Sequence, residues 1–115
     1  MSRAARGQDA ERSACAYLER RGLVLVERNF RTRRGEIDLV MRQGRDLVFI
    51  EVRYRSNHRF GGGLESVDAA KRRRLIAAAQ EYLQRHGHRC AARFDVVAMD
   101  ADGRIDWIRN AFDAG

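Results

Sequence analysis

Proline is absent from this chain of 115 residues, and cysteine occurs only twice, at Cys15 and Cys90. Without proline, the ends of helices and strands must be read from glycines and polar clusters. Two cysteines do not make a disulfide scaffold, and two reduced thiols in a cytosolic protein are the simpler interpretation. No apolar run approaches the roughly 18 residues of a membrane span, which excludes a transmembrane protein. The N-terminal segment has no apolar signal core, so we expect a cytoplasmic protein.

Acidic residues are outnumbered by basic ones. The chain has 16 Asp and Glu against 23 Lys and Arg, which gives a formal net charge of +7. Such a balance favours a polyanionic partner, most often nucleic acid. A hydrophobic content of 44% excludes a disordered, charge-dominated chain, and the length favours one domain. We expect residues 1–6 to form a flexible basic arm, residues 7–110 the domain and residues 111–115 a tail.

Hydrophobic spacing predicts two helices and five strands. The helices are expected from about Gly7 to Arg21 and from the N-cap residue Asp68 to about His86. Runs of β-forming residues predict the strands at 23–30, 36–41, 47–54, 94–99 and 105–108. The order is α-β-β-β-α-β-β. A hairpin meander followed by a helical crossover predicts an α/β fold with a mixed central sheet flanked by helices.

Two acidic residues, Asp38 and Glu51, lie inside hydrophobic strands. A buried charge is costly unless it is paired, hydrogen-bonded or bound to a cation. If the hairpin closes near Gly44, strand alternation places Asp38 level with Glu51 or one pair away, with Arg53 beside them. Two close carboxylates repel unless a cation or proton intervenes, and such oxygen ligands suit Mg²⁺ or Mn²⁺. Ion pairs with neighbouring arginines are the alternative interpretation.

Two further acids are less informative. Glu11 borders the apolar stripe of the first helix, from where it could reach the acidic pair, although a solvated position explains it equally well. Asp95 lies in the apolar strand at 94–99 and is interpreted as a residue of a structural polar network, without a catalytic role.

Basic residues flank the acidic strands and begin the second predicted helix. The helix dipole disfavours positive charge at that end, so phosphate binding is one interpretation and a solvated face is the other. The candidate nucleic-acid-binding residues are Arg33, Arg34, Arg55, Arg59, Lys71, Arg72, Arg73 and Arg74. Contacts of this kind position a nucleic acid without reading its sequence.

Several motifs give the chain a family resemblance. They are GEIDLV at 35–40, FIEVRYR at 49–55, RFGG at 59–62, KRRRL at 71–75 and RFDVV at 93–97. With them, the chain resembles the YraN family of small bacterial proteins over residues 11–97. That family is similar to the restriction-endonuclease-like superfamily, which includes the archaeal Holliday-junction resolvases. The α-β-β-β-α-β core of that superfamily matches the predicted order.

The resemblance implies a PD-(D/E)xK nuclease site that binds Mg²⁺ or Mn²⁺. Asp38 matches its first acid, Glu51 its second, and Glu11 the helical acid of the resolvase branch, which makes these three the expected metal ligands. Arg53 stands where the superfamily usually has lysine. Arginine keeps the charge but cannot serve as a base, so Arg53 is expected to stabilise the charged phosphate in a catalytic set with Asp38 and Glu51.

Three functional hypotheses follow. The first is a metal-dependent nuclease that hydrolyses phosphodiesters in structured or branched DNA. The second is a non-catalytic DNA- or RNA-binding module with a degenerate nuclease fold. The third is a protein-interaction subunit whose basic surface meets an acidic partner. No membrane partner is expected. Such nucleases cut two strands by pairing two subunits, which makes a homodimer compatible with the first hypothesis, although no particular residue supports it.

Overall fold

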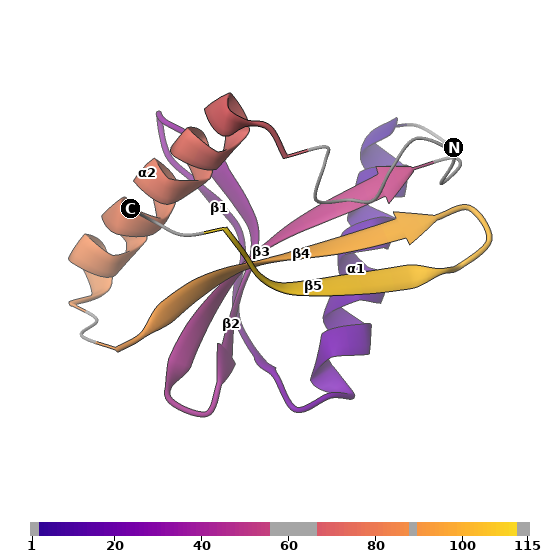
Figure 1. Cartoon of the computed structure of the whole chain (residues 1–115), viewed down its shortest axis with the longest axis horizontal. Coiled ribbons are helices and arrows are strands. Elements are labelled where there is room, and N and C mark those ends of the chain that lie inside the picture. The colour runs from indigo at the N-terminus through magenta and orange to yellow at the C-terminus, as the bar shows by residue number, and fades with distance from the viewer. Residues whose placement is uncertain (1–2, 56–66, 88–89, 113–115) are drawn as a thin grey trace.

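The helices and strands follow one another in the predicted order. The computed structural model describes residues 3–55, 67–87 and 90–112 (Figure 1). Its elements are α1 (Arg3–Glu19), β1 (Val24–Arg31), β2 (Glu36–Gln43), β3 (Asp46–Arg55), α2 (Ala69–His86), β4 (Ala92–Asp100) and β5 (Ile105–Phe112). This arrangement confirms the predicted α/β class and the α-β-β-β-α-β core.

The two ends of the fold extend beyond their predicted limits. α1 begins at Arg3 rather than at Gly7, since the preceding Arg-Ala-Ala-Arg segment contains good helix formers and no breaker. β5 continues to Phe112, into the segment predicted as a tail. A register irregularity between β4 and β5, with Asn110 at a φ of 50°, brings Phe112 back onto the sheet. There its ring stacks on Phe94, with 4.7 Å between the ring centroids.

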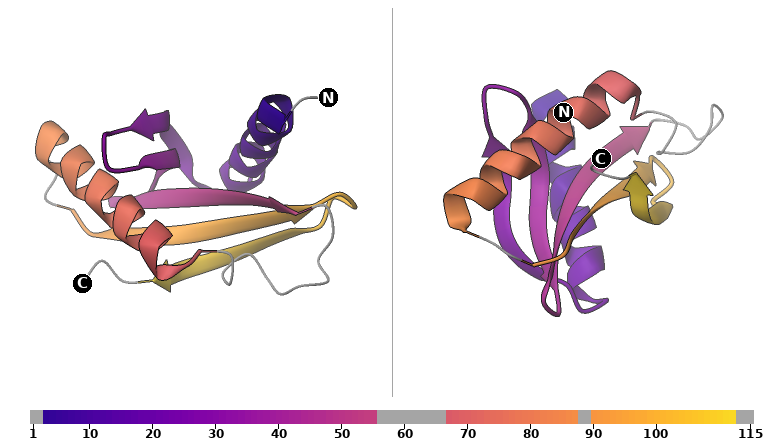
Figure 2. Two further views of the ribbon diagram at one scale, coloured as in Figure 1. Left: turned by 90° about the horizontal axis from the view of Figure 1, so that it is seen from above. Right: turned by 60° about the vertical axis from the view of Figure 1, so that its left-hand side comes forward.

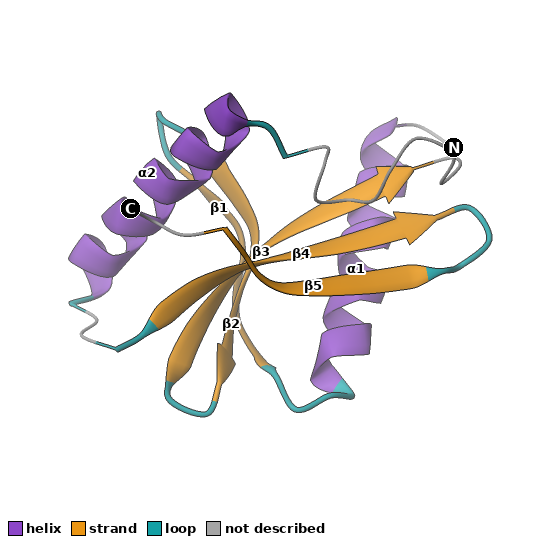
Figure 3. Ribbon diagram, in the orientation of Figure 1, coloured by secondary structure: helices purple, strands orange, loops and turns teal. Residues whose placement is uncertain are grey.

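The five strands form one mixed sheet in the order β1-β2-β3-β4-β5 (Figure 3). β1, β2 and β3 are an antiparallel meander, and β4 and β5 are also antiparallel. β3 and β4 are parallel, and α2 makes the crossover between them. Within the part of the chain that the structure describes, no helix is both long and apolar enough to cross a membrane.

The helices cover opposite faces of the sheet (Figure 2). α1 packs through Ala14, Cys15 and Leu18 against a cluster that includes the buried Leu39 and Ile50. α2 packs through its own apolar stripe on the other face. That stripe consists of the buried residues Leu75, Ala78, Ala79 and Tyr82, as the spacing predicts. Burial on both faces explains why the central strands are almost continuously apolar.

The sheet opens between β2 and β3 toward one end. Their pairing ends at Leu39 and Ile50. Beyond this point β2 stays with β1 as far as Glu36, and β3 stays with β4 as far as Arg55. The hairpin of β1 and β2 therefore separates from the other three strands (Figure 2). Residues at the opening lose their ladder partners, so side chains must satisfy the backbone there.

Candidate functional site

Asp38 and Glu51 meet where β2 and β3 separate. Leu39 and Ile50 form the last ladder pair at this end. Asp38 precedes Leu39 and Glu51 follows Ile50, so the two acids lie opposite each other, one position beyond that pair. The Asp38 carboxylate accepts a hydrogen bond of 2.8 Å from the backbone N–H of Val52. The Asp38 side chain thus accepts the hydrogen bond from an N–H group of β3 that has no backbone partner on β2. This hydrogen bond holds Asp38 at the opening of the sheet.

Glu51 is a buried carboxylate with two unlike oxygens. Its exposed fraction is only 4%. Oε1 lies 3.3 Å from Nη1 of Arg53 and 3.4 Å from Nζ of Lys71. Oε2 is buried and has no hydrogen-bond partner in the structure. Because an unsatisfied buried carboxylate oxygen is costly, Oε2 marks a position for a proton or a cation.

The pKa values of the acidic pair follow from this environment. Burial and, to a smaller extent, the negative charge of Asp38 together raise the pKa of Glu51 to about 7, against the opposing effect of Lys71 and Arg53. Burial also raises the pKa of Asp38, while the N–H of Val52 lowers it. Without a cation, Glu51 is therefore partly protonated near neutral pH.

Glu11 approaches the pair from α1. Burial, together with the negative charges of Asp38 and Glu36, raises its pKa to about 7. The side-chain amide of Asn29, with its nitrogen facing the acids, donates to Glu11 at 3.0 Å and to Glu36 at 3.3 Å. Asn29 has a φ of 53°, a left-handed conformation that asparagine tolerates better than most residues. The structure therefore brings Glu11 to the acidic cluster, with Asn29 as a linking residue that the sequence analysis missed.

The donor set fits a hard divalent cation in part. Asp38 and Glu51 offer carboxylate oxygens, one of them buried without a partner, and Mg²⁺ is commonly held by one or two carboxylates and several waters. Among the described residues, no group of three His, Cys, Asp or Glu side chains is arranged to hold a metal ion. The protein's contribution to such a site is therefore the Asp38–Glu51 pair, with Glu11 nearby on the side of α1.

The candidate phosphate-binding residues have different surroundings. Lys71 contacts Glu51 and so belongs to the acidic site. Arg72 donates from Nε to the carbonyl of Val67 at 2.9 Å and lies over the ring of Phe112, which gives it a structural role. Arg73 and Arg74, one and two residues further along α2, are exposed. Arg55 ends β3, and Arg59 lies outside the described residues.

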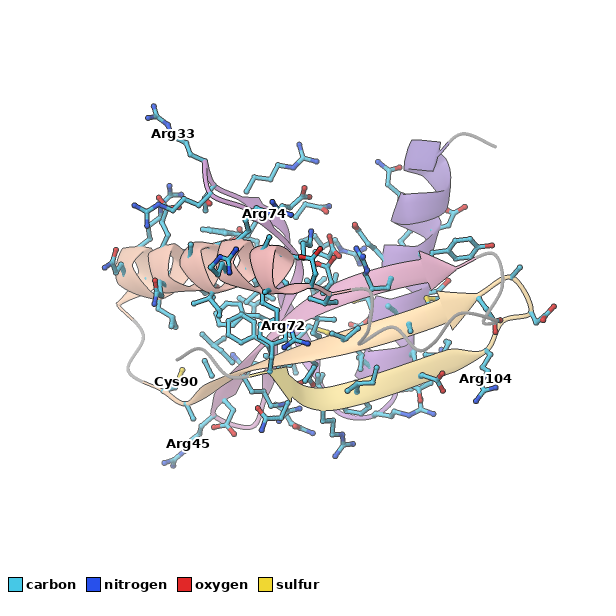
Figure 4. All side chains as sticks on the ribbon, turned by 45° about the horizontal axis from the view of Figure 1, so that its top comes forward. Arg33, Arg45, Arg72, Arg74, Cys90 and Arg104 are labelled. Carbon is cyan, nitrogen blue, oxygen red and sulfur yellow. The ribbon has the colours of Figure 1, made fainter. Side chains whose placement is uncertain are left out.

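Arg33 and Arg34 are exposed on the turn between β1 and β2. Figure 4 shows the side chain of Arg33 pointing away from the ribbon. The hydroxyl of Thr32 accepts from the N–H groups of Arg34 and Gly35 at 3.0 and 3.1 Å, which shapes the turn. Gly35 lies so close to α2 that a Cβ at this position would be 2.6 Å from the carbonyl oxygen of Arg74. This close contact places the turn beside α2, so the exposed arginines of the turn lie near those of the helix, and Arg34 lines a pocket with Gln80, Glu81 and Gln84 of α2. We call Arg33, Arg34, Arg73 and Arg74 the exposed cationic surface.

Asp95 is the buried acid whose predicted structural role is confirmed. Its exposed fraction is 1%. Oδ1 accepts from the N–H of Asn110 at 2.9 Å, and Oδ2 accepts from Nε1 of Trp107 at 2.9 Å. Arg93 pairs with the same carboxylate at 3.0 Å. Both oxygens are satisfied, in contrast to Oε2 of Glu51, so Asp95 holds β4 and β5 together and leaves no position for a ligand.

Known proteins match this chain over nearly its whole length. The family model described as "Uncharacterised protein family UPF0102" matches residues 10–99. A UPF0102 protein of Janthinobacterium sp. (strain Marseille) is 52% identical over 108 residues, which cover 94% of this chain and 87% of the relative. A UPF0102 protein of Methylococcus capsulatus is 54% identical over 111 residues, which cover 94% of this chain and 90% of the relative. The chain therefore belongs to the UPF0102 family, which is the YraN family indicated by its motifs.

Proposed function

We propose that the protein is a metal-dependent nuclease that hydrolyses phosphodiesters in DNA. The observation that carries this proposal is Glu51, a carboxylate with an exposed fraction of 4% and one unpartnered oxygen, beside Asp38. A protein that needed these acids only for stability would pair both oxygens, as it does for Asp95. Structured or branched DNA is the substrate class that the motif resemblance implies.

The residues of the site have separate tasks in this proposal. Asp38 and Glu51 hold the cation, and Glu11 supports them from α1. When bound, Mg²⁺ or Mn²⁺ supplies a Lewis acid that polarises the phosphodiester and activates a water molecule. Arg53, which is paired with Glu51, places positive charge beside the reacting phosphate and offsets the negative charge that develops there. Arginine does not act as a base, so in this proposal Arg53 does not take the proton of the attacking water.

The exposed cationic surface supplies the contacts to the substrate. Arg33, Arg34, Arg73 and Arg74 bind backbone phosphates and position the DNA, while the acidic pair carries the chemistry. Two copies of the site can cut the two strands of a duplex together, so we also propose that two subunits act on such a substrate. The mass of the protein–DNA complex in solution tests this point.

The decisive experiment is a cleavage assay with Mg²⁺ or Mn²⁺. Linear, flapped, single-stranded and four-way-junction DNA are offered to the wild type, to Glu51→Gln and to the matched control Asp106→Asn. Asp106 is an exposed acid of β5 that pairs with Arg104. We expect the wild type and the control to cut at least one substrate and Glu51→Gln to lose cleavage. Cleavage that persists in Glu51→Gln at the rate of the control would contradict the proposal.

A non-catalytic nucleic-acid-binding module is the second candidate. Two observations favour it: Arg53 stands in place of the superfamily's lysine, and no three ligating side chains in the described residues form a metal site. This candidate predicts salt-sensitive DNA or RNA binding by the wild type and by Glu51→Gln, with no cleavage by either and no heat on titration with Mn²⁺.

A further inference from the structure

The two carboxylate oxygens of Glu51 have different surroundings. Lys71 and Arg53 both contact Oε1, at 3.4 and 3.3 Å. Oε2 is buried and has no hydrogen-bond partner. The orientation of this carboxylate therefore determines whether a bare oxygen remains for a cation, and the groups that hold Oε1 control that orientation.

The two cations on Oε1 come from different parts of the fold. Arg53 follows Glu51 by two residues on β3, so it moves together with Glu51. Lys71 belongs to α2, a separate element that packs on the sheet through Leu75 and Ala78. Lys71 therefore ties the carboxylate of Glu51 on β3 to α2, a separate element of the fold.

Lys71 is itself held in place. It lies in the first turn of α2, and its backbone N–H donates to Oδ1 of the N-cap residue Asp68 at 2.8 Å. This cap sets where the helix begins and thereby which residue of the first turn faces Glu51. The side chain of Lys71 is 29% exposed and that of Glu51 is 5% exposed, so their ion pair is shielded from much of the solvent.

We propose that Lys71 is a positioning residue for the cation site, rather than a residue that binds substrate phosphate. Its ammonium group holds Oε1 of Glu51 so that Oε2 stays available to the cation shared with Asp38. This inference rests on the proposed nuclease function, because it presumes that the Asp38–Glu51 pair binds a divalent cation.

The affinity for Mn²⁺ tests this role, because loss of the charge of Lys71 and loss of its positioning role would change that affinity in opposite directions. Loss of a positive charge near a dication removes repulsion, which on its own tightens Mn²⁺ binding. Loss of a positioning residue weakens it, and the partners of metal ligands typically contribute about 10- to 100-fold in affinity. The sign of the change in Lys71→Met, which keeps an unbranched side chain, therefore separates the two roles.

The experiment is a calorimetric titration with Mn²⁺ alone on the folded, full-length protein. It compares the wild type, Lys71→Met, Asp38→Ala and the charge-matched control Arg45→Met. Arg45 is exposed in the turn between β2 and β3, before the beginning of β3 (Figure 4). We expect Lys71→Met to weaken Mn²⁺ binding about tenfold and Arg45→Met to leave it unchanged. Unchanged or tighter binding by Lys71→Met would overturn the inference.

Two further measurements distinguish a positioning role of Lys71 from phosphate binding. In the Lys71→Met background, Arg53→Lys returns an ammonium group to Oε1, so we expect it to recover part of the Mn²⁺ affinity. In DNA binding without metal, Lys71→Met keeps the salt slope of the wild type, whereas loss of a phosphate contact would reduce that slope by about 1. A reduced slope would assign Lys71 to phosphate binding and overturn the positioning role.

Failure of the proposed function gives a different result. In that case the wild type itself produces no Mn²⁺ heat, and Asp38→Ala matches it, so the inference fails together with the function on which it rests. If the wild type binds Mn²⁺ and Asp38→Ala does not, while Lys71→Met binds as the wild type does, only the inference fails.

Discussion

At the residue scale, the protein contains two kinds of buried acid. Asp95 accepts hydrogen bonds with both oxygens, including those from Trp107 and Asn110. Glu51 has one oxygen in ion pairs and the other without a hydrogen-bond partner. The first acid satisfies donors that would otherwise be buried and unpaired, and the second leaves an acceptor unsatisfied. The same type of substitution should therefore have opposite effects on stability at the two positions.

Glu51→Gln should stabilise the metal-free protein above neutral pH. The pKa of Glu51 is raised from 4.5 to about 7 in the folded state, and this value already includes the attraction of Lys71 and Arg53. A neutral amide avoids the cost of the charge, which we expect to increase the free energy of unfolding by about 1–3 kcal/mol at about pH 8. Urea titration followed by Trp107 fluorescence measures the change. Destabilisation of Glu51→Gln would contradict the prediction.

The pH dependence of the wild type has a defined sign. Glu11 and Glu51 each bind a proton more tightly in the folded state than in the unfolded chain, because their pKa values are raised to about 7. The free energy of unfolding of the metal-free protein should therefore fall as pH rises from about 4.5 to about 7 and lose this dependence above that window. Urea midpoints across this range test the sign. Glu51→Gln should show a smaller decline than the wild type.

At the element scale, Asp95 joins β4 to β5. Asp95→Asn removes an acceptor from Trp107 or Asn110 and leaves the charge of Arg93 without its partner. Loss of a buried charged partner costs about 3–5 kcal/mol, so we expect destabilisation of that size, measured by urea unfolding. Trp107 is the only tryptophan, so its fluorescence spectrum should also change in the folded state. Stability equal to that of the wild type would remove the proposed structural role.

Gly35 tests the contact between the turn of β1 and β2 and the helix α2. An added Cβ would lie 2.6 Å from the carbonyl oxygen of Arg74, which is backbone and has little room to move. Gly35→Ala should cost about 1–3 kcal/mol in stability and weaken DNA binding, because it separates Arg33 and Arg34 from Arg74. Gly7→Ala is the matched control, since a Cβ at Gly7 meets nothing within 4 Å. Equal thermal melting of the two variants would argue against the close contact.

Sequence patterns were most informative where local interactions decide the structure. The limits of α2 follow from its N-cap Asp68 and from Gly87, which ends the helix with a φ of 63°. Both signals lie in the sequence next to the helix. Strand ends were less predictable because pairing partners extend them. β5 continues to Phe112 since the ring stacks on Phe94 of the neighbouring strand, a contact that depends on the folded sheet.

In the candidate site, too, local features were predictable from the sequence and contacts between separate elements were not. Strand alternation and the position of the hairpin place Asp38 level with Glu51 or one pair away, and the register between β2 and β3, whose last pair is Leu39 and Ile50, leaves the two acids level. The contact between Lys71 and Glu51 was not predictable, because it depends on how α2 packs across the sheet. Asn29 was missed for a related reason. Its left-handed backbone turns the amide toward Glu11, and no pattern of hydrophobic residues reports such a conformation.

At the scale of the whole molecule, the net charge of +7 should govern the interaction with DNA. If the four exposed arginines on the turn and on α2 each neutralise one phosphate, the slope of log K against log salt is about −3.6. Affinity should then fall about 100-fold between about 50 and 200 mM salt. Fluorescence anisotropy with a labelled DNA duplex measures this dependence. Affinity that does not change with salt would rule out the cationic surface as the binding site.

The order of the strands in the sheet is also their order along the chain. Each antiparallel pair can therefore close as a local hairpin during folding, whereas the parallel pair β3–β4 must wait until α2 has bridged it. Without proline, no prolyl isomerisation delays the process. Docking of α2 is then the step that brings Lys71 to Glu51, so a partly folded chain, even with its hairpins formed, carries an incomplete site. Completion of the crossover thus couples maturation of the candidate site to the end of folding.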